Sequence, residues 1–307
     1  MLRFKKELKI AIELVRKATE ITEWFRVKAL ESFLKPDQSP VTIADFASQI
    51  YIVSKLKAHF PEDEIIAEEE NIDYIDLKSE HLIKQCFDEL EVEELKIIKE
   101  NIGYQGKSSE RQWTVDPIDG TAGYQEGLSY SVGIGLMINS HPKICAIGVP
   151  NYNRKSLAIF SAEEGQKAHV SYDNKDLRPI RVSQKEDIKN IRLCHSLHYD
   201  KPWVLNFAQN IGINNFIQID SMAKFCMVAD GSADLYIKPL DAAHSFTWDF
   251  LPGDLIVREA GGDITDLNGK RLKFKKEKCL WTAPGIVASN GLIQIEIIDL
   301  IKRNRLN

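Results

Sequence analysis

The sequence predicts an α/β protein with two lobes, and three observations lead to this prediction. The chain has 307 residues, enough for about two domains or one large two-lobed unit. Its N-terminal part has apolar residues three and four positions apart, as in amphipathic helices. Short apolar runs follow, and beyond about residue 180 strand-like and helical stretches alternate. We therefore expect an α+β lobe over residues 1–178 and an α/β lobe over residues 179–307.

Helices are expected to make up most of the N-terminal part. The apolar spacing predicts one long helix that Pro36 ends. Thr42, followed three residues later by Asp45, is typical of the start of a second helix, which Pro61 closes. The dipole of that helix favours a carboxylate at Asp45, in its first turn. The expected elements are helices over 4–33 and 42–59, a strand over 64–67 and surface helices over 71–101.

Strands are expected in the middle of the chain, and strands together with helices beyond it. Runs bounded by Gly, Pro and Asn predict an antiparallel sheet over residues 112–115, 129–137, 143–149 and 157–161. The later strand-like runs are residues 191–194, 216–219, 235–237 and 286–288. The later helical stretches lie near 202–210 and 222–230, over 248–260 and from 291 onwards. This alternation predicts the α/β character of the second lobe.

Composition and charge exclude several classes of protein. Hydrophobic residues make up 44% and charged residues 28%, which excludes a disordered, collagen-like or coiled-coil chain. The net charge of −5 offers no overall positive field for nucleic acid. The five cysteines form no Cys-x-x-Cys pair and indicate neither a disulfide framework nor a zinc ribbon. With no signal peptide and no apolar run near the ~20 residues of a membrane span, we expect a cytoplasmic protein that binds no membrane.

Two carboxylates follow directly after an apolar strand in the middle of the chain. Asp116 and Asp119 stand three apart in the segment Val-Asp-Pro-Ile-Asp-Gly-Thr, residues 115–121. Pro and Gly force a turn there, so both carboxylates can face one point. The same residues are also ordinary turn formers, and a purely structural turn is the alternative.

Further carboxylates recur at comparable places in the chain. Glu68 and Glu69 close the strand over 64–67, and Asp249 opens the helix over 248–260. Clustered carboxylates must either take up protons or bind cations, and hard oxygen ligands suit Mg²⁺. Two such ions ~4 Å apart form a clamp for in-line phosphoryl displacement. The pattern therefore predicts metal-dependent hydrolysis of a phosphate ester.

These motifs resemble those of the inositol monophosphatase superfamily. Residues 116–121 are similar to its Asp-Pro-Ile-Asp-Gly-Thr motif, and residues 248–262 to its second motif, which runs from Trp-Asp to Glu-Ala-Gly-Gly. Residues 39–42, Asp45 and Glu68–Glu69 are similar to its N-terminal elements. The resemblance covers nearly the whole chain. It implies an α/β layered sandwich (αβαβα) of the inositol monophosphatase and fructose-1,6-bisphosphatase type, with the site in the cleft between two lobes.

Within the superfamily, the chain is most similar to the 3′(2′),5′-bisphosphate nucleotidases. The residues that carry this similarity are 103–106, 146–151, 220–226, 233–236 and 285–289. It implies removal of the 3′-phosphate from adenosine 3′,5′-bisphosphate, and also from 3′-phosphoadenylyl sulfate. It further implies two or three Mg²⁺ ions and inhibition by Li⁺, with Na⁺ as a further candidate inhibitor.

Two departures from this branch leave alternatives open. Ala122 stands where the branch has Lys, which favours an inositol polyphosphate 1-phosphatase as the alternative. Leu251 and Pro252 replace a pair of small residues, and we expect them to affect only a helix start, where Pro is tolerated. A third possibility is a catalytically inactive relative that binds metal or nucleotide. The oligomeric state is open, and a monomer is favoured.

The resemblance implies metal ligands by position. Glu68, Asp116 and the carbonyl of Ile118 would hold a first metal ion. Asp116, Asp119 and Asp249 would hold a second, and Glu68 would share a third if one binds. Asp116 would therefore bridge two ions.

The resemblance also implies how water and phosphate are positioned. Thr121, hydrogen-bonded to Asp45, would orient and activate the attacking water. The backbone N–H groups of Gly120 and Thr121 would face the phosphate if a helix begins there. The protein needs to supply few further catalytic groups, because phosphoryl transfer depends mostly on positioning and charge neutralisation.

Four residues are candidates for further contacts with the substrate. His198 resembles a position near the substrate phosphate, with a half-exposed strand-end residue as the alternative. Ser221 and Lys224 resemble nucleotide contacts, with a helix cap and a surface lysine as alternatives. Lys238 stands where the branch has Arg, and a phosphate contact is expected there. Glu69 is expected either to be solvated or to support the metal ligands.

Overall fold

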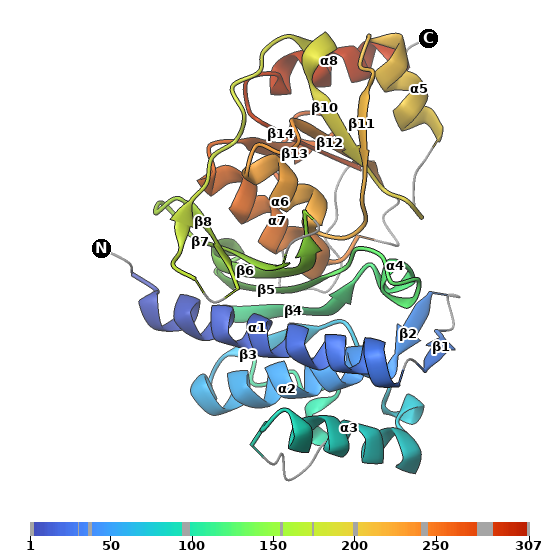
Figure 1. The fold of residues 1–307 in the computed structure, drawn as a ribbon. Coiled ribbons are helices and arrows are strands. Elements are labelled where there is room, and N and C mark those ends of the chain that lie inside the picture. Colours follow the sequence, from blue (N-terminus) through green and yellow to red (C-terminus); the bar gives the residue numbers. More distant parts are fainter. Residues whose placement is uncertain are drawn as a thin grey trace.

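Two large β-sheets alternate with three layers of helices in the computed structural model (Figure 1). It describes residues 3–29, 31–35, 39–93, 99–153, 156–173, 175–198, 202–240, 245–274 and 285–305. The inner helix layer, α6 (Ala223–Ala229) and α7 (Thr247–Glu259), lies between the two sheets. This arrangement is the predicted αβαβα sandwich, so the predicted fold class is confirmed.

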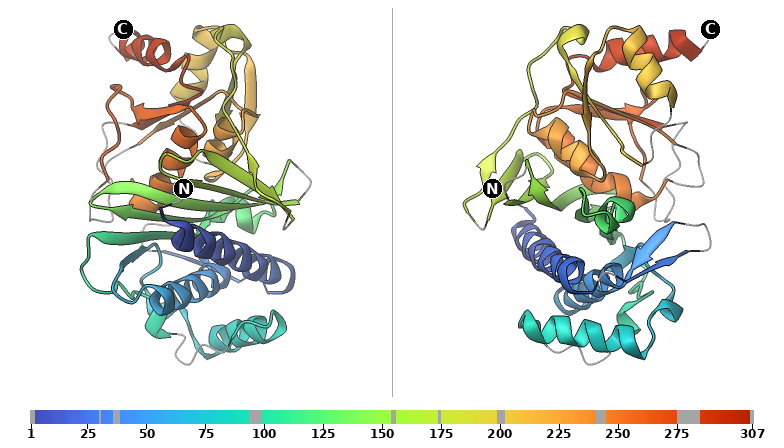
Figure 2. Two further views of the ribbon diagram at one scale, coloured as in Figure 1. Left: turned by 90° about the vertical axis from the view of Figure 1, so that its left-hand side faces the viewer. Right: turned by 45° about the vertical axis from the view of Figure 1, so that its right-hand side comes forward.

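The two outer layers cover the outer faces of the sheets. On one side lie α1 (Lys5–Lys28) and α2 (Ile43–His59), with α3 (Leu77–Glu89) outside them (Figure 2). On the other side lie α5 (Pro202–Asn210) and α8 (Gln294–Arg305). None of the helices in the described ranges combines the length and the apolar character that a membrane span requires.

The larger sheet has seven strands, and its spatial order follows the chain. The strands are β3 (Glu64–Ala67), β4 (Arg111–Asp119), β5 (Ser131–Ile138), β6 (His141–Tyr152), β7 (Ser156–Glu163), β8 (Ala168–Tyr172) and β9 (Arg178–Pro179). β3 pairs with β4 in parallel, and the pairs from β4 to β9 are antiparallel. Trp113 and Val115 of β4 pack in the core beneath α1 and α2. Since side chains alternate along a strand, Asp116 points to the opposite face, toward α7.

The smaller sheet has five strands in the order β11-β10-β12-β14-β13. Their bounds are β10 (Arg192–His195), β11 (Asn215–Gln218), β12 (Leu235–Pro239), β13 (Asp263–Asp266) and β14 (Gly285–Ser289). β10 pairs in parallel with β11 and β12, whereas β14 is antiparallel to β12 and β13. Ligands of open α/β sheets bind outside the carboxyl ends of parallel strands, and the segments 196–198 and 219–222 follow such ends.

The first helix is shorter than the sequence predicted. α1 ends at Lys28, and residues 32–34 form the strand β1 (Ser32–Leu34) instead of a last helical turn. β1 is paired antiparallel with β2 (Pro40–Thr42), where Phe33 lies opposite Val41. This pairing joins residues on both sides of a turn, and the helical spacing of the apolar residues did not indicate it. The expected second helix begins at Ile43, after Thr42.

Pro252 lies inside α7, so the expectation that it affects only a helix start was wrong. As an interior residue it has no N–H to donate to the carbonyl of Trp248, four residues earlier. Its neighbour Leu251 has room because Gly135 of β5 faces it: a Cβ at Gly135 would lie 2.2 Å from Leu251 Cδ2. Gly135 in the sheet therefore provides the space that Leu251 needs at a position where the branch has a small residue.

Candidate active site

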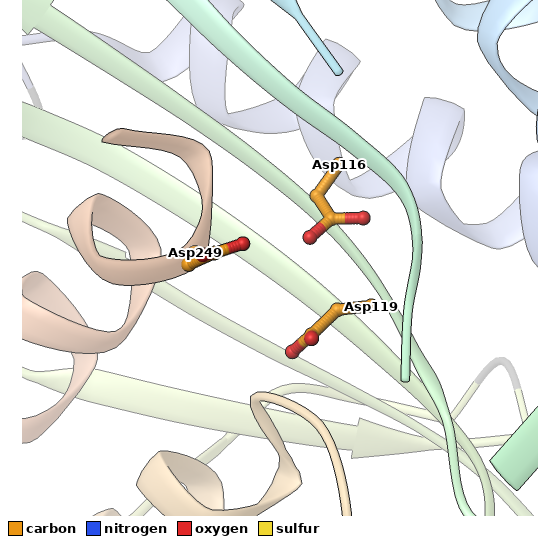
Figure 3. A group of neighbouring side chains, drawn as sticks. All are labelled: Asp116, Asp119 and Asp249. Atoms are coloured by element: carbon orange, nitrogen blue, oxygen red, sulfur yellow. The ribbon is translucent and has the colours of Figure 1, made fainter. Parts of the chain in front are cut away.

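Three carboxylates from two distant segments converge at the end of β4 (Figure 3). Asp116 and Asp119 belong to β4, and Asp249 lies in the first turn of α7. Residues three apart in a regular strand point to opposite faces, but the pairing of β4 with β5 shifts register between Asp116 and Asp119. This irregularity lets both aspartates face α7. One oxygen from each of the three carboxylates lies within 4.8 Å of the others.

Burial and mutual repulsion disfavour the ionised form of this cluster. Desolvation and the charges of Glu68, Asp119 and Asp249 raise the pKa of Asp116 well above its usual range. Desolvation likewise raises the pKa of Asp249 to about 7. Oδ1 of Asp116 is buried and has no hydrogen-bond partner among the described residues. A hard divalent cation fits such a set of oxygen donors, because it would satisfy the buried oxygen and offset the repulsion.

Glu68 and Glu69 extend the acidic cluster from the end of β3. The backbone N–H of Glu68 donates to the carbonyl of Val115, which places it beside the end of β4. Glu69 is only 4% exposed, and its backbone N–H and carbonyl both bond to the side chain of Gln49. The expected alternative of a solvated Glu69 is therefore wrong. Desolvation, followed by the charge of Glu68, raises the pKa of Glu69.

Lys35 is a cation of this cluster that the sequence analysis did not single out. Its Nζ lies 2.8 Å from Glu68 Oε1 and 2.6 Å from Glu69 Oε1. Desolvation opposes the charge of Lys35, but the two glutamates outweigh it and raise its pKa. The protein thus supplies one internal counterion on the Glu68 side of the cluster.

Asp45 and Thr121 meet beside the end of β4. Asp45 Oδ2 accepts hydrogen bonds from the backbone N–H of Thr42 at 2.8 Å and from its hydroxyl at 2.6 Å. Oδ1 of Asp45 lies 3.4 Å from Thr121 Oγ1, which is also 3.1 Å from the carbonyl of Ile118. Desolvation, together with Glu68, raises the pKa of Asp45 to about 7. The single hydroxyl hydrogen of Thr121 can donate to one of its two acceptors at a time.

Gly120 allows the chain to turn from β4 into a short helix, α4 (Thr121–Gln125). Its φ of +89° is a left-handed conformation that L side chains rarely adopt. A Cβ here would also lie 3.2 Å from Cβ of Ser221. The turn after β4 therefore packs against the turn before α6.

Two lysines face the carboxylates from the second half of the chain. Lys224 is 5% exposed, and its Nζ donates to the carbonyl of Ile219 at 3.3 Å. Lys238 Nζ lies 5.3 Å from the ring centre of Phe250, next to Asp249. Desolvation raises the pKa of Asp119, while the charges of both lysines oppose that rise. The expected alternative of a surface lysine at 224 is wrong, because Lys224 is buried.

His198 and Ser221 lie on the same side of the site as the lysines. His198 Nδ1 is 2.5 Å from Asp220 Oδ2, and its Nε2 is 3.2 Å from Glu126 Oε2. Ser221 is buried with a φ of +71°, and its hydroxyl accepts a hydrogen bond from the N–H of Ala223 at 3.2 Å. The next residue, Met222, donates its N–H to the carboxylate of Asp119. One turn therefore connects the histidine to the carboxylate cluster.

Comparison with known proteins shows the family of this chain. The model of the inositol monophosphatase family matches residues 4–304. The chain belongs to the inositol monophosphatase family. The prediction that it is a phosphatase of this superfamily is thereby confirmed.

Relatives of this family member confirm the predicted resemblance to one branch. A 3′(2′),5′-bisphosphate nucleotidase from Emericella nidulans is 33% identical, over 98% of this chain and 98% of the relative. A protein of the same name from Schizosaccharomyces pombe is 30% identical, over 96% of this chain and 95% of the relative.

Solved structures of the family share the fold. The IMPase of Thermotoga maritima superposes with a TM-score of 0.71 at 22% identity and covers 97% of both chains. The inositol monophosphatase from Anabaena gives 0.69 at 22% identity, over 98% of this chain and 96% of that one.

The fold brings together the residues predicted for the site of this family member. Asp116, Asp119 and Asp249 form one cluster, with Glu68 close enough to raise the pKa of Asp116. Three charged residues that contact predicted site residues were not among the predictions: Lys35, Glu126 and Asp220. Asp220 belongs to a segment that carried the branch resemblance, and this was the available signal for it. Lys35, close to Pro36, had no comparable signal.

Proposed function

We propose that this protein removes the 3′-phosphate of adenosine 3′,5′-bisphosphate, and of 3′-phosphoadenylyl sulfate, with the aid of Mg²⁺. The observation that carries this proposal is the convergence of Asp116, Asp119 and Asp249 opposite Lys224 and Lys238. An anionic substrate with two separated phosphate groups suits a site that has carboxylate ligands for metal ions on one side and lysine side chains on the other. The names of the relatives, 3′(2′),5′-bisphosphate nucleotidases, support the choice of substrate.

The metal ligands would act as two sets that share Asp116. Asp116, Asp119 and Asp249 would hold one Mg²⁺. Glu68, Asp116 and the carbonyl of Ile118 would hold another, and Glu68 would share a third if one binds. Bound Mg²⁺ supplies charge neutralisation for the phosphate and lowers the pKa of coordinated water. We also propose inhibition by Li⁺, and by Na⁺ as a second candidate, at the set containing Asp119 and Asp249.

Thr121 and Asp45 would position the attacking water. Asp45 is anchored by two hydrogen bonds from Thr42 to its Oδ2 at the start of α2, so its other oxygen, Oδ1, is held at one place. That oxygen lies 3.4 Å from Thr121 Oγ1 and can accept the hydroxyl hydrogen, which leaves the hydroxyl oxygen to accept a hydrogen from the water. The backbone N–H groups of Gly120 and Thr121 would bind the phosphate being removed.

The nucleotide would be held by the second half of the chain. Ser221 and Lys224 would contact it, and His198 and Lys238 would supply positive charge near its phosphates. We propose that residues 1–178 form one lobe and residues 179–307 the other, with the site at their junction. The packing of α7 against the seven-stranded sheet, and of α6 against α7 and the five-stranded sheet, supports this placement, since both helices belong to the second half.

Phosphate release from a panel of substrates tests the proposal. The panel contains adenosine 3′,5′-bisphosphate, inositol 1,4-bisphosphate, inositol 1-phosphate and fructose 1,6-bisphosphate, each with Mg²⁺ and with a chelator. We expect the nucleotide to have the highest kcat/KM and turnover to require Mg²⁺. A preference for fructose 1,6-bisphosphate or inositol 1-phosphate, or turnover without the metal, would contradict it.

One observation favours a second candidate, an inositol polyphosphate 1-phosphatase. Ala122, in the first turn of α4, offers no cation at a position where the nucleotidase branch has Lys. The same panel separates the candidates, because this enzyme would prefer inositol 1,4-bisphosphate to the nucleotide.

A further inference from the structure

A buried carboxylate to which the sequence analysis assigned no role lies behind His198. Asp220 is 3% exposed and stands between β11 and α6. Its Oδ2 lies 2.5 Å from His198 Nδ1. Its Oδ1 accepts hydrogen bonds from Ser196 Oγ at 2.6 Å and from the N–H of Leu197 at 2.9 Å. Both oxygens of Asp220 are thus used to hold the segment 196–198.

These contacts decide which ring nitrogen of His198 can reach a ligand. An ionised carboxylate only accepts hydrogen bonds, so Nδ1 of His198 carries the hydrogen that it shares with Asp220. Nε2 points away from Asp220 and lies 3.2 Å from Glu126 Oε2, after the last turn of α4. The Glu126 side chain is 60% exposed and can rotate into solvent. Nε2 therefore lies at the C-terminal end of α4, the short helix that begins at Thr121.

Asp220 is itself fixed by the segments that pack around it. Ser129 Oγ donates to the Asp220 carbonyl at 3.4 Å. Gly123 of α4 approaches closely: a Cβ there would lie 2.6 Å from the Ser129 carbonyl and 3.4 Å from Asp220 Oδ2. Two residues further along, Met222 bonds to Asp119. The orientation of His198 is therefore tied, through Asp220, to the same turn that contacts the carboxylate cluster.

We propose that Asp220 is a positioning residue that holds His198 with Nε2 directed at an anionic group of the bound nucleotide. The identity of that anion rests on the proposed function, whereas the orientation of the ring does not. The hydrogen bond to Asp220, with Glu126 on the other side, raises the pKa of His198 and favours the cation, in which both ring nitrogens donate. Nε2 can then exchange Glu126 for a phosphate oxygen.

A double-mutant cycle in the full-length chain tests whether Asp220 acts through His198. We expect Asp220→Asn to raise KM for adenosine 3′,5′-bisphosphate about tenfold and to change kcat by less than about threefold. In a His198→Ala background, Asp220→Asn should have no further effect on KM. Asp76→Asn is the matched control, because it makes the same change at a carboxylate that caps α3, in the outermost helix layer, and should leave KM unchanged. Equal effects of Asp220→Asn in both backgrounds would overturn the proposal.

An NMR measurement without substrate separates this proposal from the substrate assignment. The chain has seven histidines, so His198→Ala identifies the ring signals of His198 in ¹⁵N-histidine-labelled protein. At a pH where the His198 ring is neutral, we expect Nδ1 rather than Nε2 to be protonated in the wild type and this preference to be lost in Asp220→Asn. If the wild type shows this pattern but does not hydrolyse the nucleotide, the proposed function fails and the positioning role stands. Unchanged nitrogen signals in Asp220→Asn would refute the positioning role. Melting temperatures verify folding, and Asp220→Ser replaces Asp220→Asn if the latter does not fold.

Discussion

The two sides of the site bury charge in different ways. The carboxylate side consists of Asp45, Glu68, Asp116, Asp119 and Asp249, and the cationic side of His198, Lys224 and Lys238. On the carboxylate side, desolvation raises the pKa values of four members, and one oxygen of Asp116 is without a partner among the described residues. On the cationic side, His198 is held by Asp220, and Lys224 by a backbone carbonyl.

This difference shows which side depends on ions from solution. The protein itself supplies counter-charges and acceptors for its cations, so their geometry is set by the fold. Among the residues that the structure describes, Lys35 is the cation in direct contact with the acidic residues, and it touches Glu68 and Glu69 rather than the three clustered aspartates. We therefore propose that cations from solution complete the carboxylate side, whereas the fold itself holds the cationic side in place for an anion.

Replacement of Asp116 should have the largest effect, because both proposed metal sets share it as a ligand. We expect Asp116→Asn to lower kcat/KM at saturating Mg²⁺ by at least about a hundredfold, on the order of 3 kcal/mol of transition-state stabilisation. Glu70→Gln is the matched control, since it removes a carboxylate at an exposed position near the cluster. A mutant within about tenfold of the wild type would contradict the bridging role.

Asp45 and Thr121 should behave as a unit on the carboxylate side. Each single change, Asp45→Asn or Thr121→Ala, is expected to lower kcat by about tenfold to a hundredfold, because either one disrupts the position of the water. The double variant should lose little more than the worse single variant, since both act on one water. Losses in log kcat that add fully would mean that the two residues act independently.

A test of the cationic side uses Lys224. We expect Lys224→Ala to reduce kcat/KM for adenosine 3′,5′-bisphosphate by about tenfold, or roughly 1.4 kcal/mol. Inositol 1,4-bisphosphate has no base and should be affected much less. Lys270→Ala removes an exposed lysine and serves as the control. Equal losses on both substrates would show that Lys224 does not distinguish the nucleotide.

The smallest effect concerns stability, and it tests the dependence of the carboxylate side on cations. The pKa values of Asp45 and Asp249 are raised from the ordinary 3.8 to about 7 in the folded, metal-free protein. A carboxyl with a higher pKa in the folded state binds protons preferentially there, so the free energy of unfolding falls as pH rises from about 4 to about 7. Mg²⁺ would replace these protons and oppose the fall.

Thermal unfolding with Mg²⁺ or chelator checks this dependence. Between about pH 5.5 and about pH 7.5, the Tm of the metal-free protein should fall by a few degrees more than that of the Mg²⁺-loaded protein. In Asp249→Asn, which lacks one of the titrating groups, the difference should shrink. A Tm difference independent of pH would mean that these carboxyls are not protonated in the metal-free fold.

The sequence by itself determined the fold class and the residues of the carboxylate cluster. Asp116 and Asp119 lie in one short motif, where Pro and Gly dictate a turn directly after an apolar strand. Asp249 and Asp45 stand at helix starts that the local pattern also marks. Such signals depend on neighbours within a few positions of the chain, and they are therefore readable without the folded structure.

Only the tertiary structure decided which partners these residues have. Lys35 is 33 and 34 positions from the glutamates that it contacts, and Asp220 is 22 from His198. The residues of β1 continue a helical spacing, yet they form a strand because they pair with β2. Leu251 fits inside α7 because Gly135 in the sheet leaves space for its side chain. Contacts of this kind arise because strand pairing and layer packing bring distant segments together. They cannot be predicted from the spacing of residues within a short segment of the chain.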